Sequence, residues 1–308
     1  MDLIDVYIQL GVLFLLMLIG YILGKIKFFT PQSNAIFSKF IVNVALPAVI
    51  ISGMNMPLTK ESVNRAIVIL GLSIVIYALT FCVAWCISRT LTADERKRGV
   101  FSFMLMFSNC GFMGYPVLGA LLGQEAIFYT AIYNISFNVL LYTLGIKLLQ
   151  SGKNQSTGFD GKLLINPGVV ASLLGILLFV TGVRLPEFIS GTIESVGSVC
   201  TPLSMIVIGS MLSLLSLKKT FGDYKIYILA IVRLLVLPFI IFTFLKYILK
   251  IEDLWLITIP VIVAGMPVAS NAAMMAETYK SDGELASQGI LITTLLSCIS
   301  IPLLIYFI

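Results

Sequence analysis

The chain has 308 residues, of which 59% are hydrophobic and only 11% are charged, and its mean hydropathy is +1.04. Soluble domains average about a quarter charged residues, so this composition excludes a water-soluble globular protein. In lipid only helices and closed barrels satisfy the backbone, and the apolar runs here are about 20 residues long, which is helix length. The sequence therefore predicts an all-α integral membrane protein of the cell membrane.

Ten apolar runs follow one another along the chain and predict ten transmembrane helices. The first run begins after Asp2 and Asp5, lacks a basic flank and is too long for a signal-peptide core, so we expect it to remain as the first span. Lysine and arginine are concentrated in the loops after odd-numbered spans, which predicts that both termini lie outside the cell. The predicted spans are residues 6–24, 35–53, 64–88, 99–122, 126–149, 166–182, 192–215, 226–249, 254–278 and 285–307.

Proline-containing motifs recur in the two halves of the chain. Gly-Tyr-Pro-Val at 114–117 in span 4 matches Gly-Met-Pro-Val at 265–268 in span 9, and Pro47 in span 2 matches Pro202 in span 7. A five-span unit used twice must enter the membrane from opposite sides, because five is odd. We therefore expect two inverted five-helix repeats with broken helices 4 and 9, a pattern typical of transporters. The expected repeats are residues 1–150 and 151–308.

The breaks in spans 4 and 9 are the predicted substrate site. Proline clashes with the carbonyl four residues earlier and suits the first turn of a new helix, so each span should break before Pro116 or Pro267. Each new half-helix would then offer free backbone N–H groups and a partial positive charge to an anion. The alternative is that these residues only kink helices for packing. The candidate substrate-binding residues are Asn43, Asn109, Gly111, Gly114, Pro116, Arg233, Gly265, Pro267, Ser270 and Asn271.

Arg233 lies inside predicted span 8, where a buried charge is costly and suggests function. We expect it to pair with a substrate carboxylate or with Glu277, unless it snorkels towards the cytoplasmic interface. The chain has no histidine, and its five cysteines lack metal-ligand spacing, so neither a cofactor nor a metal site is expected and an enzyme is disfavoured. No carboxylate lies at a predicted span midpoint, which argues against a proton relay.

Several motifs together resemble the auxin efflux carrier family, within the broader group that includes bile-acid sodium symporters. The resemblance implies ten spans, a crossover of spans 4 and 9, and an elevator-like transport domain that moves against a scaffold. Related proteins carry auxin in plants and malate or malonate in bacteria. This chain lacks the long central hydrophilic loop of the plant carriers, so auxin itself is not the expected substrate. The motifs are Leu-Ile-Gly-Tyr-Ile-Leu-Gly at 18–24, Asn-Val-Ala-Leu-Pro at 43–47, Asn-Cys-Gly-Phe-Met-Gly-Tyr-Pro at 109–116, Thr-Pro-Leu at 201–203, and the stretch from Pro267 to Tyr279.

The expected function is that of a secondary transporter, an elevator-type carrier of a small organic anion such as the dicarboxylate malate or a monocarboxylate. The alternatives are a Na⁺-coupled symporter of the bile-acid type, since hydroxyl, amide and carbonyl oxygens could hold Na⁺, and a non-transporting receptor or scaffold. The expected partners are the anion and the lipid bilayer. A homodimer is left open, and no nucleic acid is expected.

Overall fold

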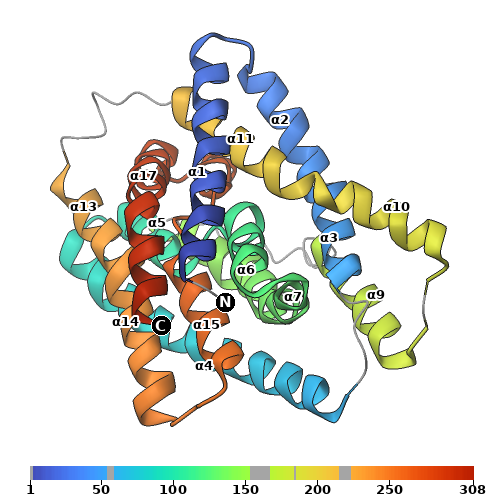
Figure 1. Cartoon of the computed structure of the whole chain (residues 1–308). Coiled ribbons are helices and arrows are strands. Elements are labelled where there is room, and N and C mark those ends of the chain that lie inside the picture. Colours follow the sequence, from blue (N-terminus) through green and yellow to red (C-terminus); the bar gives the residue numbers. More distant parts are fainter. Residues whose placement is uncertain (1–2, 54–58, 153–166, 184, 215–222) are drawn as a thin grey trace. The chain divides into compact units, whose positions relative to one another are not determined.

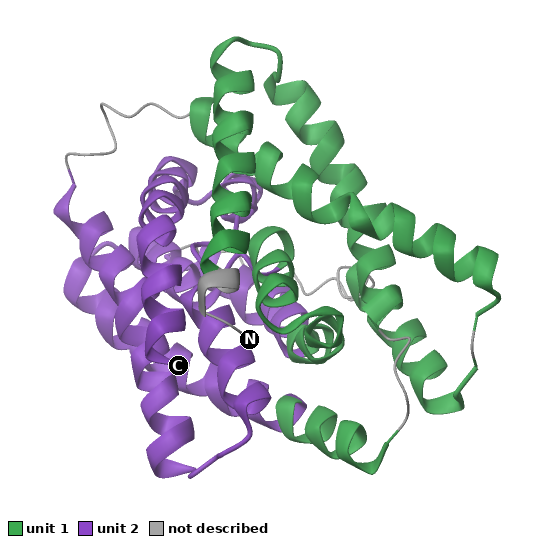
Figure 2. Ribbon diagram, viewed as in Figure 1, with its two compact units in different colours: residues 1–69, 111–135, 165–215 green, residues 70–110, 136–164, 216–308 purple. Residues whose placement is uncertain are grey.

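The computed structural model of the chain describes residues 3–53, 59–152, 167–183, 185–214 and 223–308 (Figure 1). These residues are helical and form no strand, and their one β feature is an isolated antiparallel bridge between Ser108 and Val268. They fall into two compact units, coloured green and purple in Figure 2.

Unit 1 comprises residues 1–69, 111–135 and 165–215. Its core pairing is between α1 and α11, and α3 packs against α9 and α10. The long helices α4 and α7 each begin in unit 1 and continue into unit 2. The elements of unit 1 are α1 (Leu3–Lys25), α2 (Pro31–Phe40), η1 (Ile41–Ala45), α3 (Leu46–Gly53), the start of α4 (Lys60–Leu91), most of η2 (Cys110–Gly114), α6 (Tyr115–Leu122), most of α7 (Gln124–Leu140), α9 (Pro167–Thr181), α10 (Glu187–Ser198) and α11 (Cys200–Leu214).

Unit 2 comprises residues 70–110, 136–164 and 216–308. Helix α17 is central to it, because it packs against α5, α13, η5, α15 and α16. Besides the ends of α4 and α7, the elements of unit 2 are α5 (Glu95–Met106), η3 (Leu141–Gly145), α8 (Ile146–Leu149), α13 (Tyr224–Ile231), η5 (Val232–Val236), α14 (Leu237–Thr243), η6 (Phe244–Ile248), α15 (Leu254–Gly265), α16 (Ala272–Thr278) and α17 (Gly283–Phe307).

The helices confirm a multi-pass membrane protein. Seven described segments are long and apolar enough to cross a membrane, namely Tyr7–Lys25, Pro31–Gly53, Lys60–Leu91, Gln124–Leu149, Glu187–Leu214, Tyr224–Ile248 and Gly283–Phe307. Three shorter apolar segments, Cys110–Leu122, Pro167–Thr181 and Leu254–Gly265, lie within the other three predicted spans. Each compact unit combines segments from both halves of the sequence. The two predicted repeats are consecutive halves of the chain, and a division into compact units does not test whether those halves are related. The inverted repeat therefore stays a prediction.

Three prolines explain three of the π-helical turns. A helical proline lacks its N–H and its ring meets the carbonyl four residues earlier. In each of these three turns that earlier residue is the central one, so widening the turn relieves the clash without ending the helix. The turns η1, η2 and η5 end two residues before Pro47, Pro116 and Pro238.

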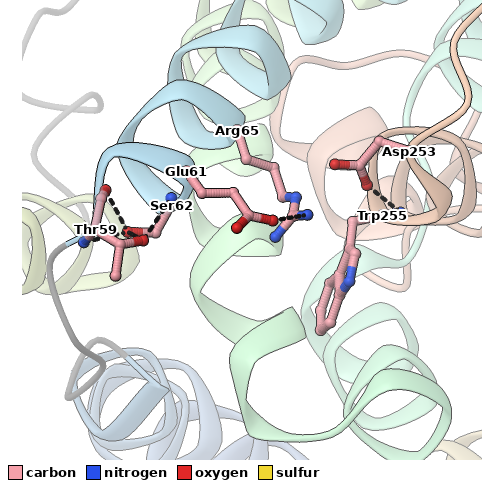
Figure 3. A network of polar contacts seen from close by, with 6 residues as sticks. All are labelled: Thr59, Glu61, Ser62, Arg65, Asp253 and Trp255. Carbon is pink, nitrogen blue, oxygen red and sulfur yellow. Dashed lines mark hydrogen bonds and ion pairs between the residues drawn. The ribbon is translucent and has the colours of Figure 1, made fainter.

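Side-chain oxygens determine where α4 and α15 begin, as Figure 3 shows. At the start of α4, the Ser62 N–H donates to Thr59 Oγ1 and the Thr59 N–H donates to Ser62 Oγ, both at 3.0 Å. At the start of α15, the Trp255 N–H donates to Asp253 Oδ1 at 2.9 Å. These side chains satisfy N–H groups that a helix start leaves unpaired, and so they locate each helix start.

Glycines allow α1 and α11 to approach each other closely. A Cβ at Gly20 would overlap the backbone carbonyl of Ile206, and one at Gly209 would overlap that of Met17. Association of helices in lipid depends on such small residues, because lipid supplies little hydrophobic driving force. These two glycines therefore allow the backbones of α1 and α11 to approach more closely than larger residues would permit.

Candidate functional site

Predicted span 4 is broken at residues 107–109. Helix α5 ends at Met106, Phe107 is extended with φ −107° and ψ 112°, and η2 begins at Cys110. The sequence predicts the break at Pro116, and this position is wrong, because Gly114 is helical with φ −60° and ψ −51°. The π turn η2 accommodates Pro116, so the helix does not need to break there.

Predicted span 9 is broken at residues 266–271, as Pro267 predicts. Helix α15 ends at Gly265, Met266 is extended with φ −67° and ψ 149°, and α16 begins at Ala272. The residue before a proline is pushed out of the helical region, which explains the extended Met266. The Met266 N–H still donates to the Val263 carbonyl at 3.3 Å.

The two breaks are joined by backbone hydrogen bonds within unit 2. The Asn109 N–H donates to the Pro267 carbonyl at 2.8 Å, and the Ala269 N–H donates to the Phe107 carbonyl at 3.1 Å. These bonds form the antiparallel bridge around Ser108 and Val268. A buried non-helical backbone needs such pairing in a membrane protein, because lipid offers no hydrogen-bond partner.

Helix α17 supplies an additional contact to the span 9 break. The Val268 N–H points away from the bridge and donates to Thr293 Oγ1 at 3.1 Å. The Thr293 hydroxyl in turn donates to the Gly289 carbonyl at 2.7 Å. Val268 and Thr293 are both fully buried, so this bond is sheltered from competing water.

Arg233 lies at the breaks and does not snorkel. Its side chain is only 2% exposed. Its Nε donates to the Met266 carbonyl at 3.2 Å, and its Nη1 donates to the Leu105 carbonyl. Both carbonyls lie where a first half-helix ends, so the guanidinium caps α15 and α5 together.

Polar groups at the start of α16 remain accessible. Ser270 and Asn271 are partly exposed, whereas residues 261–269 are buried. The Ser270 hydroxyl contacts Asn109 Oδ1 at 3.4 Å. The N–H groups of Ser270 and Asn271 donate to no acceptor in the described part of the chain, although the other N–H groups of this break are paired. Two adjacent N–H donors, the partly exposed Asn271 and the buried Asn109 thus lie at one end of the span 9 break.

Of the remaining candidates, Gly265 belongs to unit 2 and the other four belong to unit 1. Gly265 ends α15, and a Cβ there would overlap Leu304. Asn43 lies in η1 of unit 1, where its exposed amide donates to the Lys39 carbonyl at 2.7 Å. Gly111, Gly114 and Pro116 also belong to unit 1, in η2 and α6. Their contact with substrate stays a prediction.

Sequence reasoning missed Thr293 and Cys110. The Cys110 thiol is buried and lies 3.0 Å from the Ser108 hydroxyl beside the bridge. Thr293 lies far along the chain from both breaks, so no sequence motif connects it with them, whereas Cys110 directly follows Asn109 in the motif at 109–116. The wide turn that holds Arg233 does have a sequence signal, because Pro238 follows the π turn η5 that contains the arginine. No group of three or more His, Cys, Asp or Glu side chains that could hold a metal occurs among the described residues.

Apolar helices and two joined helix breaks define a multi-pass membrane protein with discontinuous spans. A family described as membrane transport proteins matches residues 5–159 and 159–305. The chain therefore belongs to this family of membrane transport proteins, the auxin efflux carrier-like family that its motifs resemble.

Relatives of similar length support the assignment to this family. An uncharacterised transporter of Methanothermobacter thermautotrophicus is 26% identical over 94% of this chain and 93% of its own length. A protein of Rhizobium meliloti with the provisional name malonate transporter is 24% identical over 95% of this chain and 92% of its own length. An uncharacterised transporter of Methanocaldococcus jannaschii is 25% identical over 95% of both chains.

Proposed function

We propose that the protein is a secondary carrier of a small organic anion, a mono- or dicarboxylate such as malate, and that the anion binds at the helix breaks of unit 2. The observation that carries this proposal is the pair of backbone N–H groups at Ser270 and Asn271, which belong to partly exposed residues and lack an acceptor among the described residues. A carboxylate has two oxygens that accept such hydrogen bonds. The carboxamides of Asn109 and Asn271 lie beside these donors and supply further ones.

Neutral donors suit a carrier that must return empty. A fixed cation exposed at the site would bind the anion tightly but would remain unpaired in the membrane after release, which is costly. The partial positive charge of a half-helix start attracts an anion without that penalty, and water can satisfy its N–H groups when the site is vacant. We propose unit 2 as the transport domain, because it holds both breaks, and unit 1 as the scaffold.

The choice of a carboxylate also follows from the relative named for malonate, a small dicarboxylate. The membrane potential could drive transport of such an anion, since moving one charge through 100 mV changes its free energy by about 2.3 kcal/mol. A Na⁺-coupled symporter is the alternative, because carbonyl and hydroxyl oxygens also surround the breaks.

Uptake into proteoliposomes tests the proposal. Purified protein is reconstituted and offered a panel of labelled organic acids, with and without an imposed potential and with and without a Na⁺ gradient. Uptake of a carboxylate that responds to the potential alone supports the proposal. Uptake only with a Na⁺ gradient supports the symporter. Binding without uptake would indicate a receptor, and the carrier proposal would then be wrong.

The two asparagines test the position of the site. Replacing Asn109 or Asn271 by alanine should leave a polar substrate group unpaired, which costs about 1–3 kcal/mol or roughly 5- to 150-fold in affinity. Binding of the transported acid to purified, folded protein measures the effect. Asn64→Ala is the matched control, because Asn64 is exposed on α4. If both site variants bind as tightly as the control, the breaks serve packing and the site lies elsewhere.

A further inference from the structure

We propose that Arg233 is a positioning residue that clamps the two helix breaks together and does not itself bind the substrate. The inference rests on the proposed function for its substrate readout, whereas the clamp itself has a readout that needs no substrate. It differs from the expectation that Arg233 pairs with a substrate carboxylate or with Glu277.

The geometry of the guanidinium is the first argument. Two different nitrogens, Nε and Nη1, donate to carbonyls of two different broken helices, at Met266 and Leu105. An intact helix would pair the Leu105 carbonyl with the Asn109 N–H, but that N–H is bonded to Pro267 instead. Arg233 therefore satisfies an acceptor that the break itself leaves free. A planar group with several fixed donors can bridge two helices in this way, whereas a single ammonium nitrogen cannot reproduce the arrangement.

Charge is the second argument. The C-terminal end of a helix carries a partial charge of about −0.5, so the two half-helix ends together carry about −1. The single positive charge of Arg233 lies against both ends and offsets this sum. The partial negative charges of the two helix ends therefore offset the charge of Arg233, so its attraction for an anion is weak. An anion would be held instead by the donors at Ser270 and Asn271.

The local fold is the third argument, because it places the arginine and both half-helix ends with little freedom. Pro238 produces the π turn η5 that holds Arg233. The ring of Pro238 also lies against Gly265, the last residue of α15, where a Cβ would approach Pro238 Cγ to 3.4 Å. One proline thus widens the turn that carries the cation and contacts the helix end that the cation caps.

Cys110 provides a native reporter of the clamp. It is buried next to the bridge, and Cys200 is equally buried in unit 1. In single-cysteine backgrounds that retain one or the other, alkylation rates by a small maleimide are compared for Arg233→Lys, Arg233→Gln and the control Arg89→Gln. Arg89 is an exposed cation of unit 2 that stacks on Trp85 at 3.7 Å.

Loss of the clamp should expose Cys110 alone. We expect Cys110 to react on the order of 10-fold faster in both Arg233 variants, and Cys200 to keep its rate, because two charge-assisted hydrogen bonds of the breaks are lost. The lysine variant retains the charge, so it decides the question if the glutamine variant does not fold. Unchanged Cys110 rates in the folded lysine variant, or a parallel rise at Cys200, would overturn the inference.

Substrate affinity then separates positioning from direct binding. Binding of labelled malate is measured for Arg233→Lys, Asn109→Ala and the double variant. A residue that acts through the break loses its effect once Asn109 is absent, so the two reductions in affinity should not multiply. Multiplying reductions, with affinity kept by lysine but lost by glutamine, would show direct pairing with the anion and refute the inference. If malate does not bind the wild type, the proposed substrate is wrong, but the Cys110 rates still decide whether Arg233 is a clamp.

Discussion

Replacing Thr293 by valine is a sharp test of how the span 9 break is held. The Thr293 hydroxyl accepts the Val268 N–H at 3.1 Å, and both residues are fully buried. Valine has nearly the shape of threonine, so packing changes little and only the acceptor is lost. The carbonyl of Gly289, to which the hydroxyl donates, keeps its helical partner within α17.

The magnitude follows from leaving one buried N–H without an acceptor. Such a group costs about 1–3 kcal/mol, which is roughly 5- to 150-fold in an equilibrium constant. Opening of the break would give the unpaired N–H a water partner, and it would also separate the neighbouring Ala269 N–H from the Phe107 carbonyl. We therefore expect amide exchange at Val268 and Ala269 to accelerate by roughly 5- to 150-fold, with weaker substrate binding in parallel.

Hydrogen–deuterium exchange of the purified protein measures this effect peptide by peptide. Thr294→Val is the matched control, because Thr294 is adjacent on α17, is only 1% exposed and has a hydroxyl without a hydrogen bond among the described residues. If exchange at the break is the same in the Thr293 and Thr294 variants, α17 does not hold the break, and the role assigned to this hydroxyl is wrong.

Hydropathy alone predicts the helical membrane fold, because lipid requires every span to satisfy its own backbone. Seven of the ten predicted runs correspond to described helical segments that are long enough to cross a membrane, and the other three contain shorter apolar helices. Positions within a span are harder to predict. Pro267 breaks its helix and Pro116 does not, since the backbone before Pro116 can widen into a π turn. The two prolines look equivalent in sequence, and only packing decides between a wide turn and a break.

The candidate site is predictable only in part for the same reason. Asn109 and Ser270 are in contact, and they belong to the two motifs that the sequence predicts will meet. The partners of Arg233, in contrast, are backbone carbonyls. A carbonyl has no residue type, so no sequence pattern identifies it as the partner of a cation. Thr293 is likewise one of several hydroxyl residues on α17, and its role depends on the direction of one N–H group.

Two further predictions concern packing and orientation. Gly20→Leu should destabilise the protein by about 1–3 kcal/mol or more, because its side chain would overlap the Ile206 backbone, whereas Gly11→Leu, with nothing within 4 Å of a Cβ, should leave thermal unfolding unchanged. Cysteines placed at positions 2 and 308 of a variant without its native cysteines should both react with an impermeant maleimide in intact cells. The reason is that lysine and arginine, which stay on the cytoplasmic side, are concentrated in the loops after odd-numbered spans. An even number of spans requires the two ends to lie on one side, so labelling of only one end would contradict the ten spans. Protection of both would leave the count intact and reverse the orientation, and the basic loops would then face outward.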